Sequence, residues 1–191
     1  MSERNWVTVV SGIPRSGTSL MMRMLDAGGI PALTDGARRA DTHNPHGYFE
    51  YEPVKRLAAD SSWMEAARGK SLKVIYRLLR HLPAGIPYRV LLMERDLHEV
   101  FDSQHDMLVS RGDAAVDQSS DRLIALLAGE LEDTKKWLSQ QPNVAVLAVR
   151  HRDVITNPTG QAREISDFLG GGLDEEAMAA AVDPSLYRHR R

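Results

Sequence analysis

The stretch SGIPRSGTSL, residues 11–20, has the composition of a loop that binds phosphate. Gly12 and Gly17 are five residues apart, as in the G-x-x-x-x-G-K-[ST] loops of nucleotide-binding proteins. Thr18, however, stands where those loops have Lys, and the nearest cation is Arg15, two residues before the second Gly. Backbone N–H groups of such a loop and of the following helix bind oxyanions, and hydroxyl side chains add donors. The expected anion site comprises Arg15, Ser16, Gly17, Thr18 and Ser19.

Two elements position this loop. Residues 6–13 form an apolar, β-branched run that predicts a short buried strand. Residues 18–27 have apolar side chains at helical spacing, and Gly28 and Gly29 end the predicted helix. A plain turn with surface Ser and Thr is the alternative, but a loop between a buried strand and a helix is the context in which phosphate binds.

The rest of the chain alternates apolar strands with helices, which predicts a mostly parallel sheet covered on both faces. The fold class expected is three-layer α/β/α, with the first loop at the carboxyl edge of the sheet, where ligands bind. Residues 31–60, rich in Gly, Pro, Asn, Asp and His, are expected to be irregular and functional, and to turn helical after Pro53. Asp96 and Glu99 form a capping pair for the helix that ends near residue 110. The further strands are expected at residues 71–76, 88–95 and 143–149, and the further helices at 120–140, 158–169 and 174–182.

Length and composition limit the class of protein. The chain has 191 residues and a net charge of −2, which predicts one domain over residues 1–191 and argues against a general nucleic-acid-binding protein. It has no Cys, so disulfides, thiolate metal sites and Cys nucleophiles are excluded. No apolar run approaches the roughly 20 residues of a membrane span, and the N-terminus has no signal-peptide pattern, so a cytoplasmic protein is expected. The composition leaves a homo-oligomer open.

A second motif follows the strand expected at residues 88–95. RDLHEVFDS places Arg95 at the end of that strand and Ser103 eight residues on, a rise of about 12 Å along a helix. Together with PRSGTSL, this pair resembles the sulfotransferases that use 3′-phosphoadenosine 5′-phosphosulfate (PAPS), in particular the short bacterial members, whose loop has the pattern P-[KR]-S-G-T-[ST]. The resemblance implies a P-loop NTPase-like sulfotransferase fold. It extends over NPHGYFEYE, VAVLAVRHRDVITNP, EISDFLGG and the tail VDPSLYRHRR.

The resemblance implies a role for each residue of the two motifs. Arg15 would contact the departing phosphate and the bridging oxygen, while Thr18 and Ser19 steady the phosphosulfate oxygens. Arg95 and Ser103 would grip the 3′-phosphate, which distinguishes PAPS from ATP. No metal ion is required for a transfer of this kind.

Three further positions follow from the same resemblance. His151 stands where many members place a Tyr against the adenine, and Arg188 in the basic tail would clamp the 3′-phosphate. Lys73 would contact the transferred group. It begins the triplet Lys73-Val74-Ile75, where better-known members have Lys-Thr-His, so their catalytic His is absent here.

The general base must therefore come from another position. Some branches of the family use a Glu from the loop after the first helix, which makes Glu50 the first candidate, since burial can tune a carboxylate for proton transfer. His43, His46 and Glu52 are its rivals. The acceptor expected is a small molecule with a hydroxyl or an amine.

Two other functions remain open at this point. A P-loop kinase would need Lys at position 18 and a carboxylate that ends a neighbouring strand, and only the second need is met, by Glu94. A non-catalytic relative would keep the nucleotide pocket and lack transfer, as the missing His triplet suggests. Magnesium-dependent ATP turnover would indicate the first, and nucleotide binding without turnover the second.

Overall fold

The structure is a computed structural model that describes residues 4–38, 40–41, 44–110 and 121–187 of the chain. Arg188 and His43, both candidates from the sequence, lie outside these ranges. The described strands are β1 (Val7–Gly12), β2 (Ser71–Lys73), β3 (Tyr88–Glu94) and β4 (Val144–Arg150). The described α-helices are α1 (Thr18–Ala27), α2 (Leu97–Ser110), α3 (Asp121–Ser139), α4 (His151–Thr156), α5 (Pro158–Phe168) and α6 (Glu175–Ala180). Short 3₁₀ helices lie at Glu52–Arg56, Ser62–Ala67, Tyr76–His81 and Pro184–Leu186.

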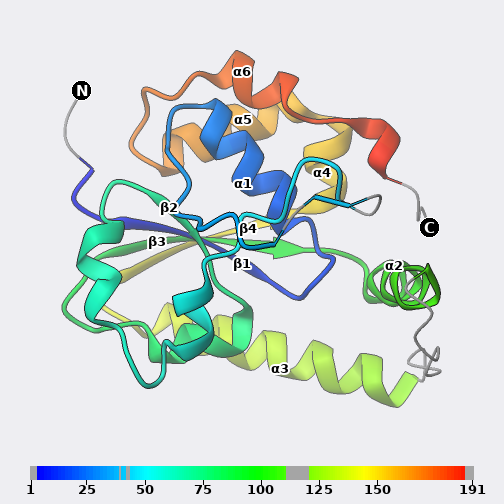
Figure 1. Cartoon of the computed structure of the whole chain (residues 1–191), viewed down its shortest axis with the longest axis horizontal. Helices are drawn as coiled ribbons and strands as arrows, with labels where there is room; N and C mark the ends of the chain where they lie inside the picture. Colours follow the sequence, from blue (N-terminus) through cyan, green and yellow to red (C-terminus); the bar gives the residue numbers. More distant parts are fainter. Residues whose placement is uncertain (1–3, 39, 42–43, 111–120, 188–191) are drawn as a thin grey trace.

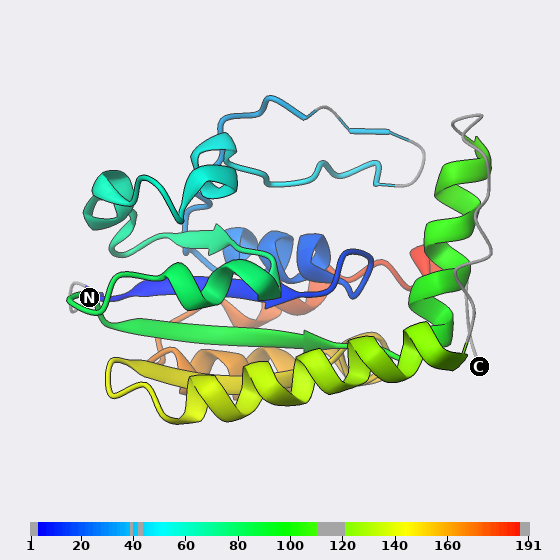
Figure 2. The same cartoon turned by 90° about the horizontal axis from the view of Figure 1, so that it is seen from below.

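The described strands pair in parallel, in the order β2-β1-β3-β4. From β1 the chain moves to one side of the sheet for β2 and to the other side for β3. The gap between the ends of β1 and β3 is therefore the switch point where α/β folds bind ligands. The register pairs Gly12 with Met93 and Glu94 with Arg150, so the strands end together at one edge. In Figure 2, α2 stands at that edge of the sheet.

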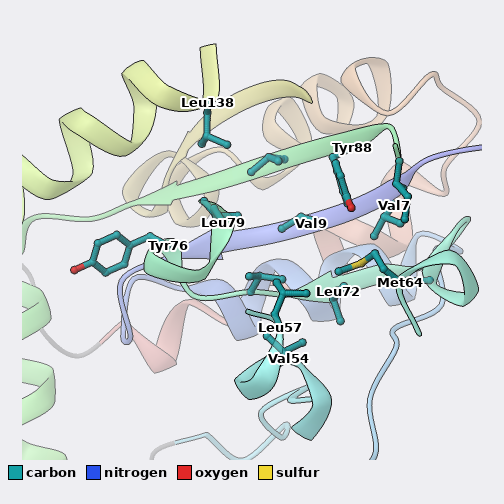
Figure 3. Close-up of a cluster of buried hydrophobic side chains, with 14 of the residues drawn as sticks. Val7, Val9, Val54, Leu57, Met64, Leu72, Tyr76, Leu79, Tyr88 and Leu138 are labelled. Atoms are coloured by element: carbon teal, nitrogen blue, oxygen red, sulfur yellow. The ribbon is translucent and has the colours of Figure 1, made fainter. Parts of the chain in front are cut away.

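Helices cover both faces of the sheet, which explains the continuous apolar runs of its strands. In Figure 1, α1, α4, α5 and α6 gather on one face and α3 lies on the other. Side chains alternate across a strand, so neighbours in β1 belong to different cores. Val9 shares a core with Leu138 of α3 (Figure 3), whereas Val10 shares the other core with Met21 of α1 and Leu91 of β3. Each fully buried side chain of this size contributes about 2 kcal/mol of hydrophobic stabilisation.

Most elements lie where the sequence predicts them. α1 spans the predicted residues 18–27, and Gly29, with a φ of 95°, follows its end. The Asp96 half of the predicted capping pair is also confirmed, because its carboxylate accepts hydrogen bonds from the N–H groups of His98 and Glu99 at 2.9 and 3.1 Å. The apolar and capping patterns thus predicted these helices from local chemistry alone.

The second strand is shorter than predicted. A strand was expected over residues 71–76, but β2 ends at Lys73 and a 3₁₀ helix begins at Tyr76. The Val74 N–H still donates to the Val10 carbonyl oxygen at 3.0 Å, after which the chain turns away from the sheet. The prediction was therefore wrong for the last residues of this run, where Val74 and Tyr76 are buried but Ile75 is 44% exposed.

The sequence also did not predict α4. This helix begins at His151, directly after β4, and ends at Thr156. Asn157 then accepts a hydrogen bond from the N–H of Gly160 at 3.1 Å and so caps α5. Six residues are too few for a helical apolar pattern to be recognised in a sequence.

Gly12 ends β1 with a φ of 151°, and a Cβ there would lie 2.5 Å from Ser16 Oγ and 2.9 Å from the Met93 carbonyl oxygen. We expect Gly12→Ala to lower the free energy of unfolding by about 2 kcal/mol, because the carbonyl cannot yield without disturbing β3. Gly85→Ala is the matched control, since Gly85 has no left-handed φ and a Cβ there meets no atom within 4 Å. Equal urea midpoints for the two variants would contradict this expectation.

Candidate functional site

The loop between β1 and α1 has a conformation that suits glycine and leaves amides for a ligand. Arg15 and Gly17 have positive φ, 74° and 99°, a region that strains Arg and is typical of functional loops. A Cβ on Gly17 would lie 2.5 Å from Cδ2 of His151, so a larger residue does not fit. Gly17 is the N-cap of α1, and no side chain of the described residues caps this helix. The first N–H groups of α1 are thus available to an anion.

Ser16 lies beneath the loop. Its N–H donates to the Ile13 carbonyl oxygen at 3.1 Å, and the residue is 1% exposed. Its hydroxyl has no hydrogen-bond partner among the residues that the structure describes. In this structure Ser16 therefore shapes the loop from within.

The two sequence motifs meet at Arg15. Its Nε donates to the Ser103 hydroxyl of α2 at 2.9 Å, and Arg95 Nη1 donates to the Arg15 carbonyl oxygen at 3.0 Å. Arg95 follows β3 directly, so the pairing of β1 with β3 brings it beside the loop. Burial lowers the pKa of Arg15, and the charge of Arg95 acts in the same direction. The structure thus joins residues separated by 88 and 80 positions in the chain.

Glu99 and Tyr187 hold Arg95, a role that sequence reasoning missed for both. Glu99 Oε2 accepts from Arg95 Nε at 3.0 Å, and Glu99 Oε1 accepts from the Tyr187 hydroxyl at 2.7 Å. The guanidinium carbon of Arg95 also lies 5.4 Å from the centre of the Tyr187 ring. The spacing of four residues between Arg95 and Glu99 was the available signal, but it coincides with the capping pattern. The resemblance brings the tail that contains Tyr187 to the site, but no local pattern pairs Tyr187 with Glu99, which is 88 positions away.

His151 lies at the end of β4, packed against Gly17 and Tyr187. Its ring meets the Tyr187 ring edge-on, with 5.1 Å between the two centres. Burial lowers the pKa of His151 to about 4, the charge of Arg95 adds to this effect, and Glu99 opposes it. The imidazole is therefore neutral at pH 7, and its Nδ1 is buried with no partner among the described residues.

Lys73, the last residue of β2, reaches the start of α1. Its Nζ donates to the Ser19 hydroxyl at 3.0 Å and to the Tyr48 carbonyl oxygen at 2.9 Å. Burial lowers the pKa of Lys73 to about 8, whereas Glu50 raises it and Arg38 lowers it. The amine is therefore mostly protonated at pH 7 and places a cation beside the loop.

Glu50 belongs to the segment at residues 34–50, whose described residues lie along one side of the structure in Figure 2, away from α3. Glu50 Oε1 accepts from Arg38 Nη1 at 2.7 Å. The Arg38 guanidinium carbon lies 3.4 Å from the centre of the Tyr48 ring, and the Tyr48 hydroxyl donates to the Asp41 carboxylate. Arg38 is a further residue that sequence reasoning missed, because no motif includes it. The Glu50 carboxylate is thus held by an Arg that is itself stacked on an aromatic ring.

Of the two described rivals of Glu50, His46 lines the same cavity and Glu52 does not. His46 is exposed at the rim of the cavity described below. His46 acts electrostatically on Asp183, whose pKa is lowered by hydrogen bonds from Ser185 and also by Arg23 and His46. Glu52 accepts from Lys55 Nζ at 2.5 Å, and its side chain is 51% exposed.

These side chains surround one cavity of about 430 Å³ at the carboxyl edge of the sheet. Ser16 and Glu52 are described residues that do not line it, and Arg188 lies outside the described residues. The sequence candidates that line it are Arg15, Gly17, Thr18, Ser19, His46, Glu50, Lys73, Arg95, Ser103 and His151. The fold thus brings most of the candidates to one place.

The described part of the chain has neither a metal-binding cluster nor a membrane-spanning helix. No group of three or more His, Cys, Asp or Glu side chains there is arranged to hold a metal ion. None of its helices has the length and apolar composition needed to cross a lipid bilayer.

A parallel sheet with a glycine loop after its first strand, beside a switch point lined with cations, is typical of the P-loop-like α/β class of proteins. The family model of the sulfotransferase domain matches residues 7–190, and the chain therefore belongs to the sulfotransferase family. No curated protein sequence matches the chain. The family that the two motifs indicate is thereby confirmed.

Two solved structures share the fold. The sulfotransferase domain from the curacin biosynthetic pathway is 16% identical, with a TM-score of 0.52, over 97% of this chain and 90% of that domain. A sulfotransferase from Mycobacterium tuberculosis is 14% identical, with a TM-score of 0.56, over 96% of this chain and 73% of that protein. At these identities the likeness shows the fold, and it confirms the P-loop-like α/β class expected from the sequence.

His151 makes the stability of the protein depend on pH. Its pKa is about 4 in the folded chain, against 6.5 for an ordinary His. Between these values the unfolded chain binds more protons, so this stability is complete above pH 6.5 and is lost as the pH falls toward 4, by up to about 3 kcal/mol. We expect His151→Gln to flatten the dependence of the free energy of unfolding on pH in this window, measured by urea denaturation.

The control for this experiment is His81→Gln, because His81 is an exposed His at the end of a 3₁₀ helix. That variant should follow the wild-type profile. If His151→Gln ran parallel to the wild type between pH 4 and 6.5, the buried neutral imidazole would not be the cause.

Proposed function

We propose that the protein transfers the sulfuryl group of PAPS to a hydroxyl or an amine of a small-molecule acceptor. Membership of the sulfotransferase family supports the class of reaction. The contact of Arg15 with both Ser103 and Arg95 is the observation that best supports the donor, because it joins the two motifs into one anion-binding surface. PAPS has anionic groups at both ends of its ribose, and this surface has a set of donors for each.

The cavity suits a nucleotide in size and charge. Its volume of about 430 Å³ lies within the roughly 300–1,000 Å³ typical of small-molecule sites. Arg15, Lys73 and Arg95 line it with positive charge, and the first amides of α1 add fixed donors. The residues present therefore fit a ligand with several negative charges.

Each part of the donor would have its own residues. The loop at residues 15–19 would hold the 5′-phosphosulfate, and Arg95 and Ser103 would hold the 3′-phosphate. His151, neutral because burial lowers its pKa to about 4, would lie beside the adenine without adding charge. Arg188 would supply a second cation to the 3′-phosphate.

When bound, PAPS supplies a sulfuryl group, whose bond to the bridging oxygen of the leaving bisphosphate is exchanged for a bond to the acceptor. Arg15 would stabilise the negative charge that develops on that oxygen, since a fixed cation in a site of low dielectric acts strongly. Lys73 would add a second charge beside Ser19, to which its Nζ is bonded at 3.0 Å. Orientation by the loop would lower the barrier further.

Glu50 would accept the proton of the acceptor. Its carboxylate lines the same cavity as Lys73 and influences the Lys73 pKa, so the two side chains lie near each other. The hydrogen bond from Arg38 at 2.7 Å holds the carboxylate in one orientation. A base must lie within hydrogen-bond reach of the proton that it takes, and such an orientation favours this. His46, at the exposed rim of the cavity, is the alternative base.

The position of Glu94 argues against the kinase alternative. A kinase needs a carboxylate beside the phosphates to hold magnesium. Glu94 Oε1 accepts from Lys135 Nζ at 2.5 Å, and Glu94 does not line the cavity. Thr18, in place of the Lys of such loops, also argues against this function.

Calorimetric titration without magnesium tests the donor. We expect 3′-phosphoadenosine 5′-phosphate to bind about tenfold or more tightly than ADP or ATP, and Arg95→Ala to remove this preference, because the Arg meets the 3′-phosphate. Arg163→Ala is the control, since the Arg163 side chain is 77% exposed. A preference of the wild type for ATP would contradict the proposal. Tight binding of the bisphosphate with no transfer across a broad acceptor panel would indicate the non-catalytic relative.

Transfer of radiolabelled sulfate from PAPS to an acceptor found in that panel tests the base. We expect Glu50→Gln to lower kcat by about 100-fold, because the amide cannot take a proton, and to change the affinity for the bisphosphate little. Glu52→Gln serves as the matched control, as Glu52 is two residues away and bonded to Lys55. Full activity in Glu50→Gln would move the assignment to His46.

A further inference from the structure

We propose that Glu99 is the positioning residue that gives Arg95 its selectivity for a phosphate at the ribose 3′ position, and that Tyr187 holds Glu99 in place. The inference rests on the proposed function, since it requires Arg95 to meet that phosphate. Glu99 and Tyr187 are both buried, and the phosphate-binding motifs assign no role to either. Glu99 is 3% exposed and Tyr187 is 8% exposed.

Two hydrogen bonds from different edges of the guanidinium orient Arg95. Its Nε donates to Glu99 at 3.0 Å, and its Nη1 donates to the Arg15 carbonyl oxygen at 3.0 Å. The guanidinium is planar, so two such contacts define the direction in which its donors point. An Arg that is oriented before the ligand arrives loses less conformational freedom on binding. Glu99 thus prepares Arg95 for one ligand geometry.

Glu99 acts from behind Arg95. A second cavity of about 430 Å³ lies next to the first, and Arg95 and Tyr187 line both cavities. Glu99 lines only the second cavity. Its effect on a ligand in the first cavity is therefore exerted through Arg95, which makes it a positioning residue and not a catalytic one.

The charge of Glu99 argues for this role over a simple contribution to affinity. A carboxylate behind an anion site repels the anion, and burying it costs solvation. Its two oxygens are instead bonded to Arg95 and Tyr187, so that the carboxylate is fixed and its lone pairs are used. The Glu99 carboxylate therefore improves selection for the 3′-phosphate only if its orientation of Arg95 favours that phosphate more than its negative charge repels it. The dissociation constants of two nucleotides measure this balance.

The ratio of two dissociation constants measures selection for the 3′-phosphate. Calorimetry gives the affinity for 3′-phosphoadenosine 5′-phosphate and for adenosine 5′-phosphate, which differ only in that group. We expect Glu99→Gln to reduce the ratio about tenfold and Tyr187→Phe about threefold, with the affinity for adenosine 5′-phosphate changed less than about twofold. A merely structural role would weaken both ligands together and leave the ratio unchanged.

The chain offers a matched control built from the same three residue types. Glu130 accepts from the Tyr76 hydroxyl and from Arg77 Nη2, the latter at 2.9 Å. None of these three residues lines either cavity. Glu130→Gln and Tyr76→Phe should therefore leave the ratio at its wild-type value.

Each outcome decides the inference. A ratio that is unchanged or higher in Glu99→Gln overturns it, as does an equal loss of affinity for both nucleotides. If the wild type itself does not prefer the bisphosphate, the proposed function fails first, and this result differs from a failure at Glu99 alone. Thermal unfolding of every variant shows which are folded. Should Glu99→Gln not fold, Tyr187→Phe decides the question, because it removes a single hydroxyl and keeps the ring.

Discussion

The candidate site depends on the parallel pairing of the described strands, because parallel strands end at the same edge of a sheet. Lys73 ends β2, Arg15 lies in the loop after β1, Arg95 follows β3 and His151 follows β4. The register holds these ends together, and a shift of one strand by two residues would displace its functional side chain by about 7 Å. Both apolar cores stabilise this register from the two faces of the sheet.

Cations gathered at one partly buried edge of a sheet cost free energy, because burial disfavours their charged forms. Burial lowers the pKa of both Arg15 and Lys73, which shows that their charges are costly there. Glu99 offsets the charge of Arg95 through a direct ion pair, and Glu50 favours the charged form of Lys73. A bound anion would add to this compensation, so that ligand binding and stability are linked in the same residues.

Lys73 connects the two halves of the cavity. On one side it bonds to Ser19 at the start of α1, and on the other to the backbone of Tyr48 in the segment at residues 34–50. Tyr48 in turn stacks with Arg38, which holds Glu50. The groups proposed for the donor and for the acceptor are thus in one connected network of contacts. Lys73 has contacts with both parts of this network.

Local chemistry explains what could be predicted. The phosphate loop, α1 and the cap of α2 follow from glycine spacing, helical periodicity and a capping residue, all of which act over a few neighbouring residues. The partners of Arg95 could not be predicted in this way, since Tyr187 approaches Glu99 across 88 positions and Glu99 by itself resembles a cap. The hydrogen bond from Arg38 to Glu50 could not be predicted either, because the segment at residues 34–50 has no regular sequence pattern. The sequence by itself determined most of the elements, though neither α4 nor the early end of β2, and the residue types that follow each strand. Tertiary structure alone decided which of those side chains touch, because contact depends on strand order and register, and no local propensity encodes these.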